Sequence, residues 1–221
     1  MKRMLMKTFV STLLLLILLA PQTCLCQDLK EDPQLDRKVK AFLEEKKHSW
    51  YNMNVPAIDG QLLYDIVLEN GYTRALEIGT STGHSAIWMA WALSKTGGKL
   101  ITIEIDERRY RQALQNFEQA GLSSFIDARL ADAHQLVKEL EGPFDFVFSD
   151  ADKNWYKNYF IDIEPKIVVG GCFTAHNISE TRSRYARGQS EFLDYVRSLD
   201  NYETSVNSSG GGVSISYKKS K

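Results

Sequence analysis

Short polar clusters follow five apolar segments of this 221-residue chain, and these clusters hold the residue types that could do chemistry. In the first, Gly79-Thr80-Ser81-Thr82-Gly83, two glycines allow a tight turn that would expose helix N-terminal amides to an anionic group. Glu104 ends the next apolar segment, where a carboxylate can accept hydrogen bonds from ribose hydroxyls. The other clusters are Ala131-Asp132-Ala133, Ser149-Asp150-Ala151-Asp152-Lys153 and His176-Asn177.

The glycine loop departs from the standard nucleotide fingerprints. It lacks the third glycine of the dinucleotide motif and the Gly-Lys-Ser/Thr ending of a P-loop, which disfavours NAD and ATP as ligands. A solvated strand end with a helix cap explains any one of these acidic residues equally well. The functional interpretation therefore depends on all five clusters lying together.

The same loop also satisfies the Gly-x-Ser-x-Gly pattern of a serine hydrolase. Ser81, Asp150 and His176 even follow one another in the chain order of an α/β-hydrolase triad. That fold needs several strands before the nucleophile, however, and only two helices are expected here. A serine hydrolase is therefore retained as an alternative only.

The elements that must position the clusters follow from the hydrophobic periodicity. Helical spacing over residues 35–43 and 58–67 predicts two amphipathic helices, which end before Asn70-Gly71. Five apolar strands then alternate with helices, and two further strands follow the last helix. The expected strands are residues 75–78, 100–105, 125–130, 144–148, 172–175, 202–206 and 213–217.

Strands and helices that alternate in this way form right-handed crossovers and a parallel sheet covered on both faces. The sequence therefore predicts an α/β protein with a Rossmann-like doubly wound, mostly parallel sheet of about seven strands and helices on both faces. The last two strands, joined across the Gly-rich loop 208–212, are expected to be antiparallel. Because ligands bind beyond the carboxyl ends of such strands, the five clusters should meet at one edge.

Residues 1–26 have the pattern of a secretory signal. Lys2, Arg3 and Lys7 precede an uncharged run of about 13 residues, whereas a bilayer span needs about 20. We therefore expect an exported protein, periplasmic or secreted, with a membrane tether through the leader or a cytoplasmic protein as alternatives. Residues 27–221 are expected to form one domain, with N-terminal helices over 27–70 and the core over 71–221.

The composition limits the partners. Hydrophobic residues make up 43% of the chain, which is enough for a substantial core. Lys and Arg number 27 against 28 for Asp and Glu, so a nucleic-acid partner is not expected. Without the leader, Cys172 would be the only cysteine, and no intrachain disulfide could form.

Taken in order, the motifs resemble those of class I S-adenosylmethionine-dependent O-methyltransferases of the catechol and caffeoyl-CoA type. The resemblance covers about residues 50–178 and the terminal segment 211–217. It is carried by Trp50, Met53-Asn54-Val55, Gly60-Gln61, Leu76-Glu77-Ile78-Gly79, Gly83-His84-Ser85-Ala86, Met89-Ala90, Glu104 and Asp150-Ala151-Asp152-Lys153. It implies that the methyl donor is surrounded by Val55, Glu77, Gly79, Ser81, Ser85, Glu104 and Asp132. Glu104 would lie at the ribose, Asp132 near the adenine, and Val55 with Ser85 near the methionine end.

The resemblance also implies a divalent cation held by two Asp and one Asn, and a Lys that handles the charge of the acceptor proton. Asp150, Asn177 and Lys153 match three of these residues, but His176 replaces the second Asp. Mg²⁺ prefers oxygen ligands, so its affinity should fall. Three interpretations follow: a softer ion such as Mn²⁺, Fe²⁺ or Zn²⁺, no ion with His176 as general base, or a vestigial site.

The resemblance therefore implies transfer of a methyl group from S-adenosylmethionine to an oxygen, in particular a phenolic or catechol-like hydroxyl of a small aromatic acceptor. Residues 27–221 would be the methyltransferase domain, and a homodimer is one assembly to test. Besides the hydrolase, a protein that binds S-adenosylmethionine without turnover is an alternative. The donor is made in the cytosol, so the leader and the donor point to different compartments.

Overall fold

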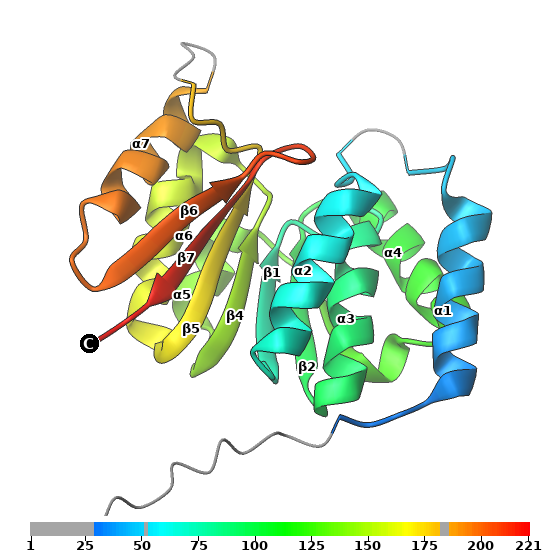
Figure 1. The fold of residues 1–221 in the computed structure, drawn as a ribbon. Coiled ribbons are helices and arrows are strands. Elements are labelled where there is room, and N and C mark those ends of the chain that lie inside the picture. The colour runs from blue at the N-terminus through cyan, green and yellow to red at the C-terminus, as the bar shows by residue number, and fades with distance from the viewer. Residues whose placement is uncertain (1–28, 51–52, 182–185) are drawn as a thin grey trace, which may run out of the picture.

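Residues 29–50, 53–181 and 186–221 are described by a computed structural model, in which seven strands form one sheet between helices (Figure 1). The order of the strands is β3-β2-β1-β4-β5-β7-β6. Their bounds are β1 (Arg74–Ile78), β2 (Lys99–Glu104), β3 (Ile126–Leu130), β4 (Phe144–Ser149), β5 (Ile167–His176), β6 (Tyr202–Asn207) and β7 (Val213–Lys218).

The sheet confirms the predicted fold class. Strands β1 to β5 pair in parallel, whereas β7 is antiparallel to both of its neighbours, β5 and β6. The chain order reverses between β1 and β4, because β2 and β3 extend from one side of β1 and the later strands from the other. The last strand is not at the edge, because it inserts between β5 and β6.

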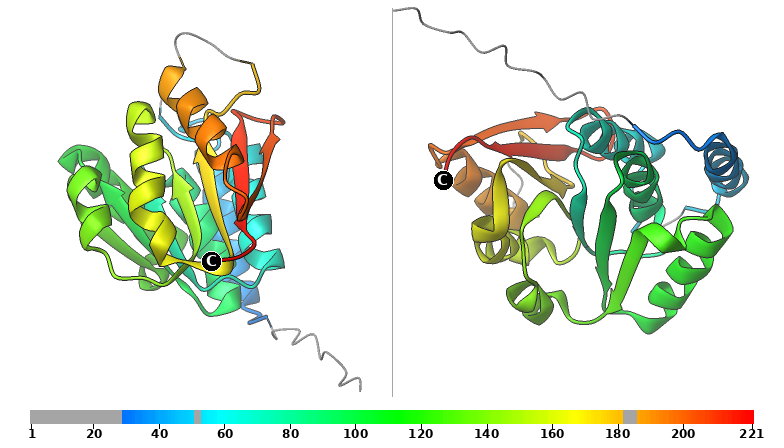
Figure 2. Two further views of the ribbon diagram at one scale, coloured as in Figure 1. Left: turned by 90° about the vertical axis from the view of Figure 1, so that its left-hand side faces the viewer. Right: turned by 90° about the horizontal axis from the view of Figure 1, so that it is seen from below.

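Helices cover both faces of the sheet (Figure 2). One core joins α1, α2, α3 and α4 to side chains such as Phe146 and Cys172, and the other joins α5, α6 and α7 to side chains such as Val147 and Phe173. Neighbouring strand residues thus enter opposite cores, as the pleat of a strand requires. The bounds are α1 (Pro33–Lys46), α2 (Ala57–Glu69), α3 (His84–Thr96), α4 (Glu107–Ala120), α5 (Ala133–Glu139), α6 (Tyr156–Ile163) and α7 (Arg187–Arg197).

Several element bounds differ from the sequence-based expectation. Strand β5 begins at Ile167 rather than near residue 172, because Gly170 and Gly171 interrupt the apolar run where the pairing with β4 shifts register. Phe125 belongs to a 3-10 turn before β3, and Trp155 to another before α6. Helix α5 begins at Ala133, because the Asp132 carboxylate caps the helix by accepting a hydrogen bond from His134 N.

The expected leader, residues 1–26, lies outside the described residues. Across the part of the chain that the structure describes, no helix combines the length and apolarity needed to cross a membrane.

Candidate active site

The ends of three neighbouring strands bring the predicted clusters together. Ile78 of β1 lies opposite Ser149 of β4, which in turn lies opposite Ala175 of β5. Gly79, Asp150 and His176 follow or end these strands at one edge of the sheet. This edge is the switch in strand order, where α/β sheets bind ligands.

A cavity of about 390 Å³ opens at this edge, a volume within the range of small-molecule sites. Four of its lining residues are acidic: Glu104, Asp132, Asp150 and Asp152. The basic groups on its wall are Arg109 and His134. Of the predicted donor-binding residues, Gly79, Ser81, Glu104 and Asp132 line the cavity. Its acidic wall suits a ligand that carries positive charge.

The glycine loop forms one wall of the cavity through unusual backbone angles. Gly79 and Gly83 have φ angles of 102° and 95°, and Ser81 has a φ of 49°. A Cβ on Gly79 would lie 2.8 Å from the backbone oxygen of Asp150, so the loop after β1 touches the loop after β4 directly. Only glycine allows this approach.

Glu104, at the end of β2, is 5% exposed and is held by several donors. Its Oε2 accepts a hydrogen bond from Ser81 N at 2.7 Å. Its Oε1 accepts from Asp106 N at 2.9 Å and from Arg109 Nη2 at 2.9 Å. Sequence reasoning missed Arg109, which lies on α4 one helical turn beyond the strand. A ribose hydroxyl that binds this carboxylate has to share it with the guanidinium.

Val55, Glu77 and Ser85 are buried but do not line the cavity in this structure. Glu77 accepts hydrogen bonds from the hydroxyls of Ser85 and Thr102. Burial raises the pKa of Glu77 to about 8, so at neutral pH this carboxyl favours the protonated form. The carbonyl of Val55 instead lies 2.9 Å from His84 Nδ1.

His134, on α5, also lines the cavity. Its ring lies 4.4 Å from that of Trp155 and 5.6 Å from that of Tyr159, measured between centroids. Its nitrogens lie 3.7 Å from Asp132 Oδ1 and 3.6 Å from Asp152 Oδ2. No hydrophobic period in the sequence indicated that His134 lines the cavity. Its position follows from the start of α5, which is capped by Asp132.

Asp150, Lys153 and Tyr156 form a connected group beside the cavity. Lys153 Nζ donates to Asp150 Oδ1 and, at 2.8 Å, to the hydroxyl of Tyr156. The Tyr156 hydroxyl donates to the backbone oxygen of His176 at 3.1 Å. Burial raises the pKa of Tyr156 well above its usual value, so the hydroxyl keeps its proton. Lys153 is therefore fixed within reach of an acceptor oxygen placed at the strand ends.

His176 ends β5 and is 4% exposed. Its Nε2 lies 2.9 Å from Asp59 Oδ2, and its Nδ1 lies 3.3 Å from Asp150 Oδ2. Burial lowers the pKa of His176, but the neighbouring carboxylates of Asp150 and Asp59 outweigh burial, so its pKa is raised. His176 therefore contacts two carboxylates, one of which no motif had indicated.

Asp59 was missed by sequence reasoning although a signal was present. The expected apolar face of α2 began at Ile58, but Ile58 is 52% exposed and Asp59 is 1% exposed. Asp59 shares the helix face of Leu63, Ile66 and Val67, which lie four, seven and eight positions further on. An acidic residue on the apolar stripe of a helix is a signal for a buried polar contact.

The serine hydrolase arrangement is not formed. His176 faces Asp59 and Asp150, and in the described residues no hydrogen bond or ion pair joins it to Ser81. The backbone amide of Ser81 serves Glu104 instead.

Asp150, His176 and Asn177 are consistent with a divalent cation site. His176 Nδ1 is buried without a hydrogen-bond partner and faces the Asp150 carboxylate. Asn177 follows with a φ of 56° and an exposed side chain. Within the described ranges no group of three His, Cys, Asp or Glu side chains is arranged to hold a metal, and this set has two such side chains and an amide.

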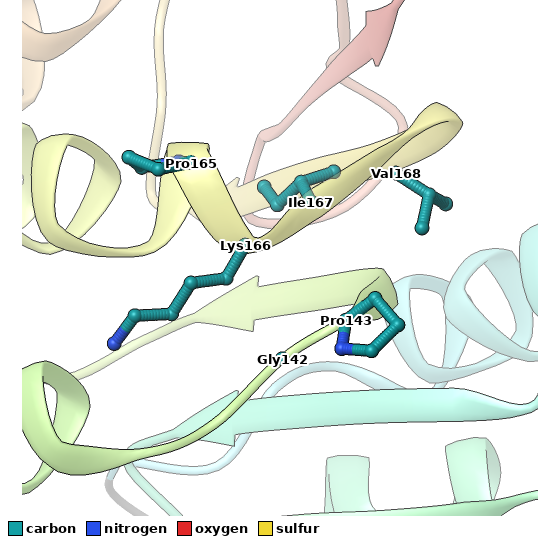
Figure 3. Close-up of a pocket in the computed structure, with 6 residues that line it drawn as sticks. All are labelled: Gly142, Pro143, Pro165, Lys166, Ile167 and Val168. Atoms are coloured by element: carbon teal, nitrogen blue, oxygen red, sulfur yellow. The ribbon is translucent and has the colours of Figure 1, made fainter.

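A second hollow, of about 350 Å³, lies at the amino ends of β4 and β5 (Figure 3). Lys166 supplies the only ionisable side chain on its wall, and its Nζ donates to the backbone oxygens of Val137 and Lys138. This hollow has no group left for chemistry.

The fold, the glycine loop at the strand switch and the acidic cavity define the class I methyltransferase architecture. Solved structures share it: the O-methyltransferase TomG from Streptomyces achromogenes, in complex with S-adenosylmethionine, has a TM-score of 0.70 at 23% identity over 87% of this chain and 92% of its own. An O-methyltransferase from Bacillus cereus, in complex with S-adenosylhomocysteine, has the same TM-score and identity over 86% of this chain and 92% of its own.

The sequence comparisons identify the family. Residues 29–180 match the O-methyltransferase family model. Caffeoyl-CoA O-methyltransferase 1 of Eucalyptus globulus is 31% identical over 73% of this chain and 67% of its own. A catechol O-methyltransferase of Niastella koreensis is 48% identical over 38% of this chain and 40% of its own. The chain belongs to the O-methyltransferase family, whose enzymes use S-adenosylmethionine, and this confirms the expected class.

Proposed function

We propose that this protein moves the methyl group of S-adenosylmethionine to a phenolic hydroxyl of a small, catechol-like acceptor. The observation that carries this proposal is the acidic cavity at the strand switch, where Glu104 ends β2 and the Asp150–Lys153 pair follows β4. A sulfonium donor is positively charged, and four carboxylates favour it over anionic nucleotides.

The names of two relatives support the choice of acceptor. They are a catechol and a caffeoyl-CoA O-methyltransferase, which the chain matches over 40% and 67% of their lengths. At the site, Lys153 carries positive charge close to the strand ends, where it can stabilise the negative charge that develops on a phenolic oxygen.

The donor supplies an electrophilic methyl group bonded to sulfur. The protein's part is to hold the acceptor oxygen in line with that carbon, so that the new O–C bond forms as the C–S bond breaks. The acceptor proton passes to water, while the Lys153 ammonium, held by Asp150, stabilises the negative charge left on the acceptor oxygen. A divalent cation held by Asp150, His176 and Asn177 would supply positive charge to neighbouring hydroxyls of the acceptor.

Two measurements on the purified protein test the function. S-adenosylhomocysteine should raise the melting temperature, because a ligand present at a hundredfold excess over its Kd stabilises the folded state by about 2.7 kcal/mol. Methyl-labelled S-adenosylmethionine should then transfer its label to catechol and not to 1,3,5-trimethylbenzene, which lacks a hydroxyl. Binding without any transfer to phenols would identify a non-catalytic binding protein, and no binding at all would contradict the proposal.

The leader motivates a second proposal, which concerns location. We propose that residues 1–26 direct export and are removed, on the basis of the charged start and the short apolar run. N-terminal sequencing of the protein from cell fractions should find a start near Gln27 outside the cytosol. An intact leader in the membrane fraction would indicate a tether, and a cytosolic start would refute export. Light scattering of the same sample would show whether a homodimer forms.

A further inference from the structure

The imidazole of His176 has one nitrogen committed to Asp59. The Nε2 of His176 lies 2.9 Å from Asp59 Oδ2, and both side chains are buried. The Gly211 amide donates to the same oxygen at 2.7 Å. A carboxylate oxygen accepts hydrogen bonds, so its contact with the ring is made by a proton on Nε2.

The backbone of the β6–β7 connection keeps this pair in place. A Cβ on Gly210 would lie 2.1 Å from Asp59 Oδ1, and a Cβ on Gly211 would lie 2.6 Å from His176 Nε2. Glycine backbone therefore packs directly on both side chains. The ring has little room to turn, and its orientation is fixed from the side opposite to Asp150.

The other nitrogen faces Asp150. Nδ1 is buried, has no hydrogen-bond partner and lies 3.3 Å from Asp150 Oδ2. With the proton on Nε2, a lone pair and a carboxylate oxygen would face each other at this distance, which is unfavourable in a buried site unless a proton or a metal ion lies between them. Histidines that bind metals commonly donate their second N–H to a carboxylate, which is the contact made by Asp59.

On these grounds we infer that Asp59 is a positioning residue for a divalent metal, which it serves by presenting His176 Nδ1 to an ion shared with Asp150 and Asn177. The inference rests on the proposed function and adds the identity of the ion. A nitrogen ligand in place of an oxygen ligand favours Mn²⁺, Co²⁺ or Zn²⁺ over Mg²⁺.

The test is metal binding itself, measured on the full chain after removal of metals by a chelator. Calorimetric titration with Mn²⁺, Zn²⁺ and Mg²⁺ should find one site that binds the first two at least tenfold more tightly than Mg²⁺. Co²⁺ should add a visible absorption band, which reports ligation without any turnover. Asp59→Asn should weaken Mn²⁺ binding about 10- to 100-fold, the usual effect of losing such a partner.

Two further variants keep the test sharp. Asp65→Asn, on the same helix, where the carboxylate accepts a hydrogen bond from Gln61, should leave metal affinity unchanged. His176→Asp should shift the preference towards Mg²⁺, and this variant still tests the site if Asp59→Asn fails to fold.

Three results would overturn the inference. They are a wild-type chain that binds none of these ions at millimolar concentration, equal affinity for Mg²⁺ and Mn²⁺, and unchanged affinity in a folded Asp59→Asn. The first would show that a proton on Nδ1 bridges His176 to Asp150 instead. S-adenosylhomocysteine binding in the same samples separates this failure from failure of the proposed function, because the donor cavity does not include Asp59.

Discussion

Three groups of the protein donate hydrogen bonds to the Glu104 carboxylate. Ser81 N, Asp106 N and the Arg109 guanidinium all point at its two oxygens. These donors fix the direction of the carboxylate before any ligand enters, so little order has to be gained on binding. The same residue can therefore serve as a rigid acceptor for ribose hydroxyls.

Glu104→Gln should weaken the binding of S-adenosylhomocysteine. A charge-assisted hydrogen bond contributes about 1.5–3 kcal/mol, so the Kd should rise roughly 10- to 150-fold. Calorimetry on the variant measures this change. Glu107→Gln, an exposed control on α4, should bind like the wild type. An unchanged Kd in Glu104→Gln would remove Glu104 from the donor site.

Lys153→Met should separate binding from chemistry. The side chain is within reach of the acceptor and does not line the donor cavity, so kcat should fall about a hundredfold while the Kd for S-adenosylhomocysteine stays within twofold. Lys157→Met is the matched control on α6: the Lys157 ammonium lies over the Tyr195 ring of α7, and this variant should keep full turnover. Equal loss of binding and turnover would indicate that Lys153 has a structural role.

At the scale of elements, the start of α7 supports the turn that carries Lys153. A Cβ on Gly188 would lie 2.3 Å from the backbone oxygen of Lys153 and 2.6 Å from the Cα of Asn154. Backbone atoms cannot give way as a flexible side chain can. The start of α7 therefore fixes the position of the Lys153 backbone relative to the strand ends.

Gly188→Ala should destabilise the protein by about 1–3 kcal/mol, because it overpacks this contact. Urea unfolding should show the loss, and turnover should fall with it because Lys153 is displaced. Ser190→Ala, in the same helix turn, is the control. A more stable Gly188→Ala would show that the gain in helix propensity prevails and that the contact is loose.

The elements were predictable because the central strands are short apolar runs between turn residues. Leu76 and Ile78, for example, are fully buried in β1, as a central strand of a parallel sheet requires. The positions of Glu104 and Asp150 followed from the rule that parallel strands end at one edge. Asp59 and His176 are 117 positions apart, and only the insertion of β7 beside β5 encloses their contact. No period in the sequence encodes the contact between Asp59 and His176, and the one signal for Asp59 was its place on the apolar face of α2.

At the scale of the whole molecule, a buried ionisable group makes the stability of the folded protein depend on pH. His84 lies between Val55 and Trp88, its Nδ1 2.9 Å from the Val55 carbonyl and its Nε2 3.1 Å from the Trp88 Nε1. Burial lowers its pKa from 6.5 to about 4. The unfolded chain therefore binds a proton between these values that the folded protein does not bind.

Stability should accordingly fall as the pH drops from about 6.5 towards 4, with roughly 2 kcal/mol lost through His84 at pH 5. His84→Gln cannot titrate, so its deficit in unfolding free energy relative to the wild type should be about 2 kcal/mol smaller at pH 5 than at pH 7.5. Urea unfolding at the two pH values measures this difference. The exposed His48→Gln should follow the wild type, and parallel pH curves for His84→Gln would contradict the assignment.

The insertion of β7 between β5 and β6 also sets the order in which the molecule can be completed during synthesis. Strand β6 pairs only with β7, and β7 closes the side of β5 that ends at His176. A nascent chain that ends before Val213 has every residue of the donor cavity but leaves β5 as an open edge. In such a chain the contact between His176 and Asp59 is enclosed only once β7 pairs with β5.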